Sequence, residues 1–120
     1  MGEYSMGAVE SRFADMIWRT EPVTSAELVQ QAAQELAWKK STTYTVLKKL
    51  CEKGVLRNES STVTSAVPRE AVDHHAAEDF VGKTFGGSLP GFLTAFMGGR
   101  KLTEGEAEDL KRLIDQYKEG

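Results

Sequence analysis

Cysteine is almost absent from this 120-residue chain, which contains Cys51 alone, and long apolar runs are absent altogether. A single cysteine cannot form a disulfide within the chain and cannot build a cysteine-based zinc or copper cluster. No apolar run approaches the roughly 18 residues that cross a bilayer. The first residues also lack the basic and apolar segments of a signal peptide. We therefore expect a cytoplasmic protein whose fold depends on neither disulfides nor metal.

The chain has little net charge, because its 15 Lys and Arg residues nearly balance its 18 Asp and Glu residues. The net charge of -3 nevertheless hides a local excess of positive charge between residues 38 and 57, where the only acid is Glu52. The basic residues of this stretch are Lys39, Lys40, Lys48, Lys49, Lys53 and Arg57. A local cluster of this kind is typical of nucleic-acid-binding proteins, even when the overall pI is acidic.

Two helices are predicted before this basic stretch. Residues 6–19 carry an apolar stripe at i, i+4, i+7 and i+8, formed by Val9, Phe13, Met16 and Ile17. Thr24 followed by Glu27 is a capping-box pattern, in which each side chain satisfies an amide at the start of a helix. The second helix therefore begins there and runs to about residue 37. Its predicted apolar side consists of Leu28, Val29, Ala32, Ala33 and Leu36.

A third helix is predicted from Ser41, as the N-cap, to Gly54. Its inner face has the 3.6-residue spacing of a helix and consists of Thr43, Val46, Leu47 and Leu50, with Cys51 at the edge. The outer face carries hydroxyls and lysines, which suit base edges and phosphates. Two helices in tandem with a polar, basic second helix are typical of a helix-turn-helix DNA reader. The predicted DNA-binding residues are Lys39, Lys40, Ser41, Thr42, Tyr44, Thr45, Lys48 and Lys49.

A small β-hairpin is predicted after the third helix. Residues 55–57 and 62–67 favour β-strands and flank a run of turn-forming residues, so they read as the wing of a winged helix. Pro68 closes this unit, and another helix follows from Glu70 to about Phe85. We expect a winged helix-turn-helix DNA-binding domain over residues 1–68.

The remaining residues 69–120 predict a helical dimerisation domain. A short apolar segment, residues 89–97, lies between two Gly-Gly pairs, and Thr103 with Glu106 forms a second capping box before a final amphipathic helix. Fifty residues of short helices cannot bury this apolar surface alone, so a second copy is the expected cover. The predicted dimerisation residues are Phe80, Phe85, Leu89, Phe92, Leu93, Phe96, Leu110, Leu113, Ile114 and Tyr117.

Other kinds of site receive less support from the sequence. Cys51 lies at the edge of an apolar face and has no second cysteine to react with, which favours a packing role. His74 and His75 have Glu78 and Asp79 one turn on, but adjacent histidines point about 100° apart and no third metal ligand is evident. No spacing indicates a catalytic constellation or a phosphate-binding loop. We expect no enzyme activity, no cofactor and no metal.

Several motifs together resemble the penicillinase-repressor family, which includes the methicillin-resistance and copper-responsive repressors. In the amino-terminal half these are M-I-W at 16–18, E-P-V-T at 21–24, E-L-V at 27–29, and V-L-K-K-L at 46–50 with Trp38, Thr42 and Thr45 before it. In the carboxyl-terminal half they are F-G-G-S-L at 85–89 and the run from Leu102 to Ile114. The likeness covers nearly the whole chain.

The resemblance implies a mainly α-helical protein with a β-hairpin wing that represses transcription as a homodimer on an inverted-repeat DNA operator. It also implies an inactivating protease or another inducer. The family's β-lactam branch is cleaved at an Asn-Phe bond, whereas this chain has Ala95-Phe96 at the matching place, and the copper branch has a C-terminal cysteine cluster that is missing here. The wing also lacks the family's basic-aromatic character. A winged-helix adaptor that binds a protein in place of DNA is the alternative interpretation.

Overall fold

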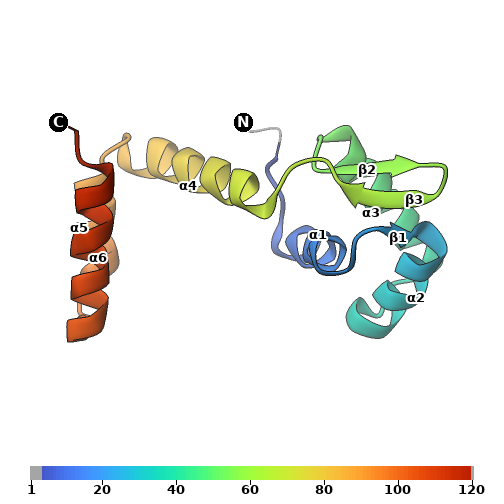
Figure 1. Ribbon diagram of the computed structural model, residues 1–120, viewed down its shortest axis with the longest axis horizontal. Helices are drawn as coiled ribbons and strands as arrows, with labels where there is room; N and C mark the ends of the chain where they lie inside the picture. Colours follow the sequence, from blue (N-terminus) through green and yellow to red (C-terminus); the bar gives the residue numbers. More distant parts are fainter. Residues whose placement is uncertain (1–3, 120) are drawn as a thin grey trace.

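Residues 4–119 are described in the computed structural model of the chain and contain six helices and three short strands. In chain order they are α1 (Ala8–Thr20), β1 (Val23–Thr24), α2 (Ser25–Leu36), α3 (Lys40–Glu52), β2 (Leu56–Glu59), β3 (Thr62–Ser65), α4 (Arg69–Phe85), α5 (Leu89–Met97) and α6 (Glu104–Tyr117). Helices α1 to α3 and the strands form one unit, and α4 leads away from it to α5 and α6 (Figure 1). The predicted fold class, mainly α with a small β wing, is confirmed.

The amino-terminal unit has a single apolar core between its helices and its sheet. Its largest fully buried apolar side chains are Phe13, Met16, Ile17, Leu28, Leu50, Val55 and Val63. These residues come from α1, α2, α3, the turn before β2, and β3. Val23 of β1 and Leu56 of β2 are buried in the same cluster, so every element of the unit contributes to one core. Burial of this apolar area is the main stabilising contribution that positions α3.

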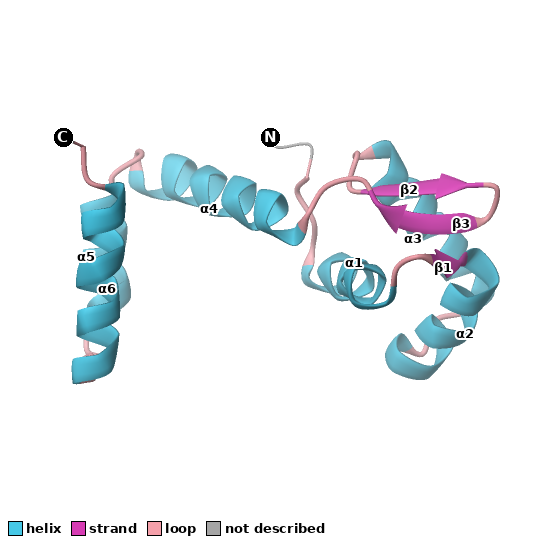
Figure 2. Ribbon diagram, in the orientation of Figure 1, coloured by secondary structure: helices cyan, strands magenta, loops and turns pink. Residues whose placement is uncertain are grey.

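The sheet has a third strand that the sequence pattern does not predict. β1 pairs with β3 in antiparallel register, Val23 opposite Val63, and the sheet order is β1-β3-β2 (Figure 2). A two-residue strand has no detectable periodicity, and its partner lies far along the chain. The hairpin itself was predicted correctly, and its turn places Ser60 and Ser61 at positive φ values of 52° and 68°.

The capping boxes were also predicted correctly. The Glu27 amide donates to Thr24 Oγ1 at 3.1 Å, and the Thr24 amide donates to Glu27 Oε1 at 2.9 Å. At α6, the Glu106 amide donates to Thr103 Oγ1 at 3.1 Å, and Thr103 N–H donates back to Glu106 Oε1 at 3.0 Å. Both pairs satisfy amides that the first helical turn leaves without partners.

The prediction that Ser41 caps the third helix was wrong. The N-cap lies two residues earlier, at Lys39, which makes no side-chain capping bond, and α3 begins at Lys40. The Thr43 amide and hydroxyl both donate to the Lys39 carbonyl, at 3.0 and 3.2 Å, so the first turn already includes Ser41. The packing of this turn therefore overrides the local preference of serine for an N-cap.

Two side chains predicted to be apolar contacts lie in solvent. Val9 is 50% exposed because the core side of α1 begins one turn later, at Phe13. Ala33 is exposed, since α2 buries Leu28 and Ala32 on a narrower stripe than predicted. Within the described residues, no helix combines the length and the apolar character of a membrane span.

Candidate nucleic-acid interface

A short turn sets the geometry of α2 and α3. Ala37 ends α2 in the left-handed conformation, with φ of 57°, and the Trp38 amide donates to the Ala32 carbonyl at 3.3 Å. The Trp38 ring packs against buried Phe13 of α1, with 5.2 Å between ring centroids. Because both α1 and α2 hold the turn, α3 leaves it in a defined direction.

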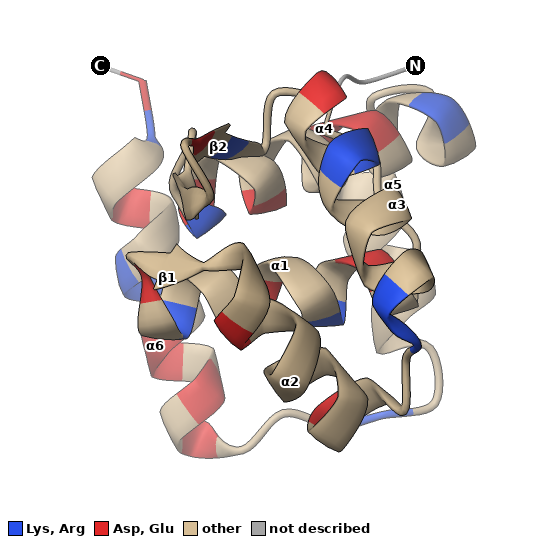
Figure 3. Ribbon diagram, turned by 90° about the vertical axis from the view of Figure 1, so that its right-hand side faces the viewer, with Lys and Arg blue, Asp and Glu red and all other residues tan. Residues whose placement is uncertain are grey.

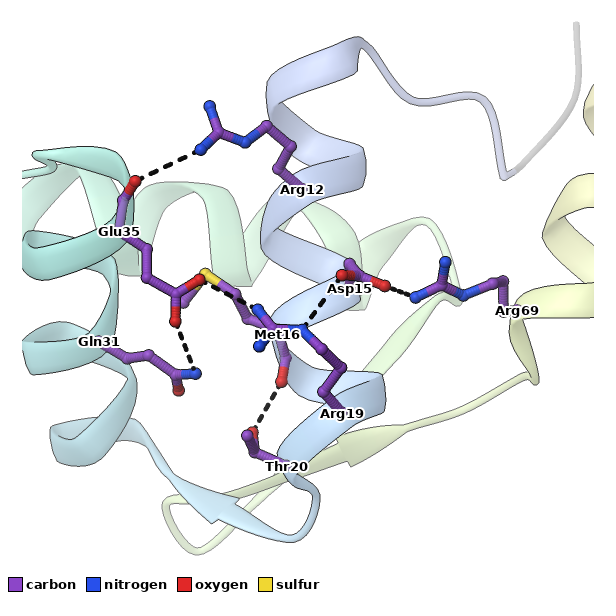
Figure 4. Close-up of polar contacts among 8 residues, drawn as sticks. All are labelled: Arg12, Asp15, Met16, Arg19, Thr20, Gln31, Glu35 and Arg69. Atoms are coloured by element: carbon purple, nitrogen blue, oxygen red, sulfur yellow. Dashed lines mark hydrogen bonds and ion pairs between the residues drawn. The ribbon is translucent and has the colours of Figure 1, made fainter.

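A network on α1 holds the carboxyl-terminal end of α2 (Figure 4). Arg19 contacts Asp15 Oδ2 at 3.2 Å and Glu35 Oε1 at 3.0 Å, and Arg12 reaches the Glu35 carbonyl at 3.4 Å. Hydrogen bonds from Gln31 and Arg19 hold the pKa of Glu35 below its usual value. These contacts hold the carboxyl-terminal end of α2, which leads into α3, against α1.

The inner face of α3 is buried as predicted at its centre. Thr43, Leu47 and Leu50 are at most 2% exposed, whereas Val46 and Cys51 are half-buried at the edges. Burial raises the pKa of the Cys51 thiol, and the nearby Glu52 carboxylate adds to this effect. The thiol therefore stays protonated near neutral pH, which fits a packing residue better than a reactive one.

The outer face of α3 presents the predicted polar groups to solvent. Its exposed members include Ser41, Thr42, Tyr44, Thr45 and Lys48. The Thr45 hydroxyl donates to the Ser41 carbonyl at 2.9 Å, so its oxygen retains only its role as an acceptor. Among residues 4–119, the Thr42 hydroxyl has no hydrogen-bond partner, so it can both donate and accept. The two threonines thus offer different hydrogen-bonding chemistry to a ligand.

The predicted lysines divide into two sets (Figure 3 shows basic positions along α3). Lys39, Lys40 and Lys48 are exposed, and within residues 4–119 no carboxylate lies at ion-pair distance from them. Lys49 is also exposed, but its Nζ contacts Glu10 Oε2 of α1 at 3.1 Å. The structure therefore places seven of the eight predicted residues on or beside the outward face, with Lys49 turned toward α1.

The wing adds one basic side chain that the predicted site did not include. Arg57 is exposed on β2, opposite Thr64 of β3, and it follows α3 after a single turn. Glu21 holds the end of β3, because its carboxylate accepts hydrogen bonds of 2.8 and 2.9 Å from the amide and hydroxyl of Ser65. Arg57 belonged to the basic stretch of the sequence, but only the strand pairing gives its position.

Several contacts join α4 to the amino-terminal unit. Val72 is 6% exposed and packs in the core, and Arg69 pairs with Asp15 while lying over the Trp18 ring at 5.2 Å. His75 contacts the ring of Tyr4, with 5.8 Å between centroids. His74 instead pairs with Glu78 at 3.4 Å. Neither histidine belongs to a group of three metal-ligating side chains among the residues described.

Aromatic rings dominate the junction of α4 and α5. The rings of Phe80, Phe85 and Phe92 meet edge to face at 5.6–6.1 Å, and Phe96 stacks on Phe92 at 5.8 Å. Such contacts orient the short α5 against the end of α4.

Much of the apolar surface of this carboxyl-terminal part stays exposed. The exposed fractions are 51% for Phe80, 57% for Leu89, 51% for Phe96, 49% for Leu113, 58% for Ile114 and 82% for Tyr117, whereas Phe85, Phe92, Leu93 and Leu110 are half-buried. A groove of about 390 Å³ runs between α5 and α6, lined mainly by Phe92, Leu93, Phe96, Met97, Leu102 and Leu110. Apolar surface of this extent is unusual on a monomeric protein.

The arrangement α1-β1-α2-α3-β2-β3, with a polar and basic outer face on α3, defines a winged-helix protein. The chain belongs to the penicillinase repressor family, whose model matches residues 6–116, nearly its whole length. Members of this family regulate transcription and are not enzymes. A comparison with curated proteins gives no match.

Proposed function

We propose that this protein is a transcriptional repressor that binds an inverted-repeat DNA operator as a homodimer. The observation that carries the proposal is the outer face of α3, where hydroxyls and Lys48, which has no carboxylate partner among residues 4–119, lie opposite a buried apolar face. A helix of this kind fits the major groove, which admits one α-helix and displays hydrogen-bonding groups of all four base pairs.

The proposed division of labour on α3 follows from its chemistry. Ser41, Thr42, Tyr44, Thr45 and Lys48 face the bases, with Thr42 and Thr45 as the main readers. Lys39 and Lys40, at the start of the helix, contact phosphates. The sequence predicts the same role for Lys49, but its Nζ contacts Glu10 in the folded chain. Phosphate contacts supply affinity and orientation, whereas base contacts supply specificity.

The exposed apolar surface of residues 69–120 supports the homodimer. A second copy that covers Phe96, Leu113 and Ile114 would remove these apolar side chains, each about half exposed in one chain, from water. Joining two DNA-binding units, proposed as residues 1–68 of each chain, makes the second half-site contact intramolecular and strengthens binding.

A footprint with a salt series tests the proposal. The purified protein should protect two equal half-sites on DNA upstream of its own gene, with an affinity that falls steeply as salt rises. Light scattering on the same sample should give twice the 13.2 kDa mass of the chain. Binding of random and upstream DNA with equal affinity would contradict the repressor and favour the protein-binding adaptor.

A further inference from the structure

Glu10 lies between the first turn of α1 and the last turns of α3. Its Oε2 contacts Lys49 Nζ at 3.1 Å, and its Oε1 contacts Lys53 Nζ at 3.3 Å. The same Oε1 accepts the Gly7 amide at 3.1 Å, which caps α1. The Glu10 side chain is only 16% exposed, so this carboxylate is directed into the contact between the two helices.

The two lysines are held to different degrees. Lys53 Nζ also donates to the Ser5 carbonyl at 2.6 Å, and its side chain is 26% exposed. Among residues 4–119, Glu10 is the one carboxylate that contacts Lys49, whose side chain is 57% exposed. An ion pair this exposed is weak by itself. Lys49 is therefore held by Glu10, whereas Lys53 is held by both Glu10 and the Ser5 carbonyl.

The Glu10 carboxylate stays charged at neutral pH. Burial acts to raise its pKa, but the hydrogen bonds from Gly7, Lys49 and Lys53 outweigh burial and leave the pKa below its ordinary value of 4.5. A permanent negative charge thus faces the two lysines at the end of α3. Lys39, Lys40 and Lys48 have no such carboxylate among residues 4–119.

We propose that Glu10 is a specificity-determining residue of the DNA-binding surface, because it withholds Lys49 and Lys53 from DNA phosphates and confines phosphate contacts to Lys39 and Lys40. The inference rests on the proposed function. In a specific complex, base contacts set the register of α3, and the lysines beside the outer face meet the backbone. In a non-specific complex no register is imposed, so any released lysine finds a phosphate. Withholding two lysines lowers non-specific affinity most.

The test replaces Glu10 by Gln in the full chain and measures binding to a random-sequence 30-bp duplex over a salt series. Each released lysine should steepen the slope of log K against log salt by about 0.9, so Glu10→Gln should steepen it by about one to two units. At low salt the variant should bind this duplex roughly three- to tenfold more tightly than the unaltered protein. An unchanged or shallower slope overturns the proposal.

Asp79→Asn is the matched control. Asp79 holds Lys83 at 3.1 Å on α4, away from α3, so the control also removes one carboxylate and releases one lysine. Its slope should stay near that of the unaltered protein. If Asp79→Asn steepens the slope as much as Glu10→Gln does, net charge explains the effect and the proposal fails.

Lysine variants keep the proposal testable even if Glu10→Gln does not fold. Lys49→Ala should reduce the slope by less than half as much as Lys40→Ala, and an equal reduction overturns the proposal. Where Glu10→Gln folds, adding Lys49→Ala should return the slope most of the way to its original value. The proposed function fails separately, if the unaltered protein binds the upstream DNA no more tightly than the random duplex.

Discussion

The indole N–H of Trp18 donates a 3.0 Å hydrogen bond to the carbonyl oxygen of Val67, which joins the end of α1 to the segment that enters α4. The two residues are 49 positions apart in the sequence. Arg69 lies over the same indole ring and pairs with Asp15, so three contacts with two residues of α1 hold the start of α4. The direction in which α4 leaves the amino-terminal unit therefore depends on Trp18.

Trp18→Phe should lower the free energy of unfolding by about 1 kcal/mol more than Trp38→Phe does. Both changes shorten a half-buried indole, but only the first leaves the Val67 carbonyl without its donor. Urea unfolding at one fixed protein concentration measures the difference, because the stability of the proposed dimer would depend on concentration. Equal losses for the two variants would contradict this role of the hydrogen bond.

Thr24→Ala should destabilise the protein by about 1 kcal/mol, since the Glu27 amide loses its capping acceptor at the start of α2. Thr24→Ser keeps the hydroxyl and serves as the control, so it should retain most of the stability. Thermal unfolding followed by circular dichroism measures both. A serine variant as unstable as the alanine variant would show that the methyl group matters more than the cap.

The stability of the protein should fall when the pH drops below about 4.5, in part through Glu27. Hydrogen bonds from the Thr24 amide and hydroxyl hold the pKa of Glu27 below its ordinary value of 4.5. The unfolded chain therefore takes up the proton first, and the contribution present above 4.5 is lost as the pH falls through the lowered pKa. Unfolding of Glu27→Gln between pH 3 and 6 should depend less on pH than that of the unaltered protein.

Thr45→Ala and Lys40→Ala should separate base reading from phosphate binding. We expect Thr45→Ala to weaken operator binding far more than random-sequence binding, because it removes an acceptor and a methyl group from the outer face. Lys40→Ala should weaken both alike and make the salt slope shallower by about one unit. Gel shifts on both duplexes over a salt series give the comparison. Equal patterns in the two variants would refute the assigned roles.

Ile114→Asp should shift the protein toward monomer, because a carboxylate would then lie where an apolar side chain, 58% exposed in one chain, is proposed to meet the second copy. Val9→Asp is the matched control, since Val9 is 50% exposed on the amino-terminal unit. Sedimentation velocity at micromolar concentration measures the shift. A dimer unchanged by Ile114→Asp would place the interface elsewhere.

Features encoded over a few neighbouring residues were predicted from the sequence. The capping boxes at Thr24 and Thr103, the amphipathic face centred on Leu47, and the hairpin with its Ser60–Ser61 turn all depend on contacts within about one helical turn or one strand pair. Such local interactions act on nearby side chains and leave a periodic pattern. For the same reason, the sequence predicted that the hydroxyls and lysines of α3 lie on one outer face of the helix.

The amino-acid order by itself thus determined which helices form and which of their faces are apolar. Tertiary structure alone decided that Val23 pairs with Val63, that α3 begins at Lys40, and that Lys49 turns toward Glu10. Each of these depends on residues from elements that are distant in the chain and that meet only when the core closes around Phe13. The sequence determines that Lys49 is charged, but the packing of α1 against α3 determines that the Glu10 carboxylate lies beside it.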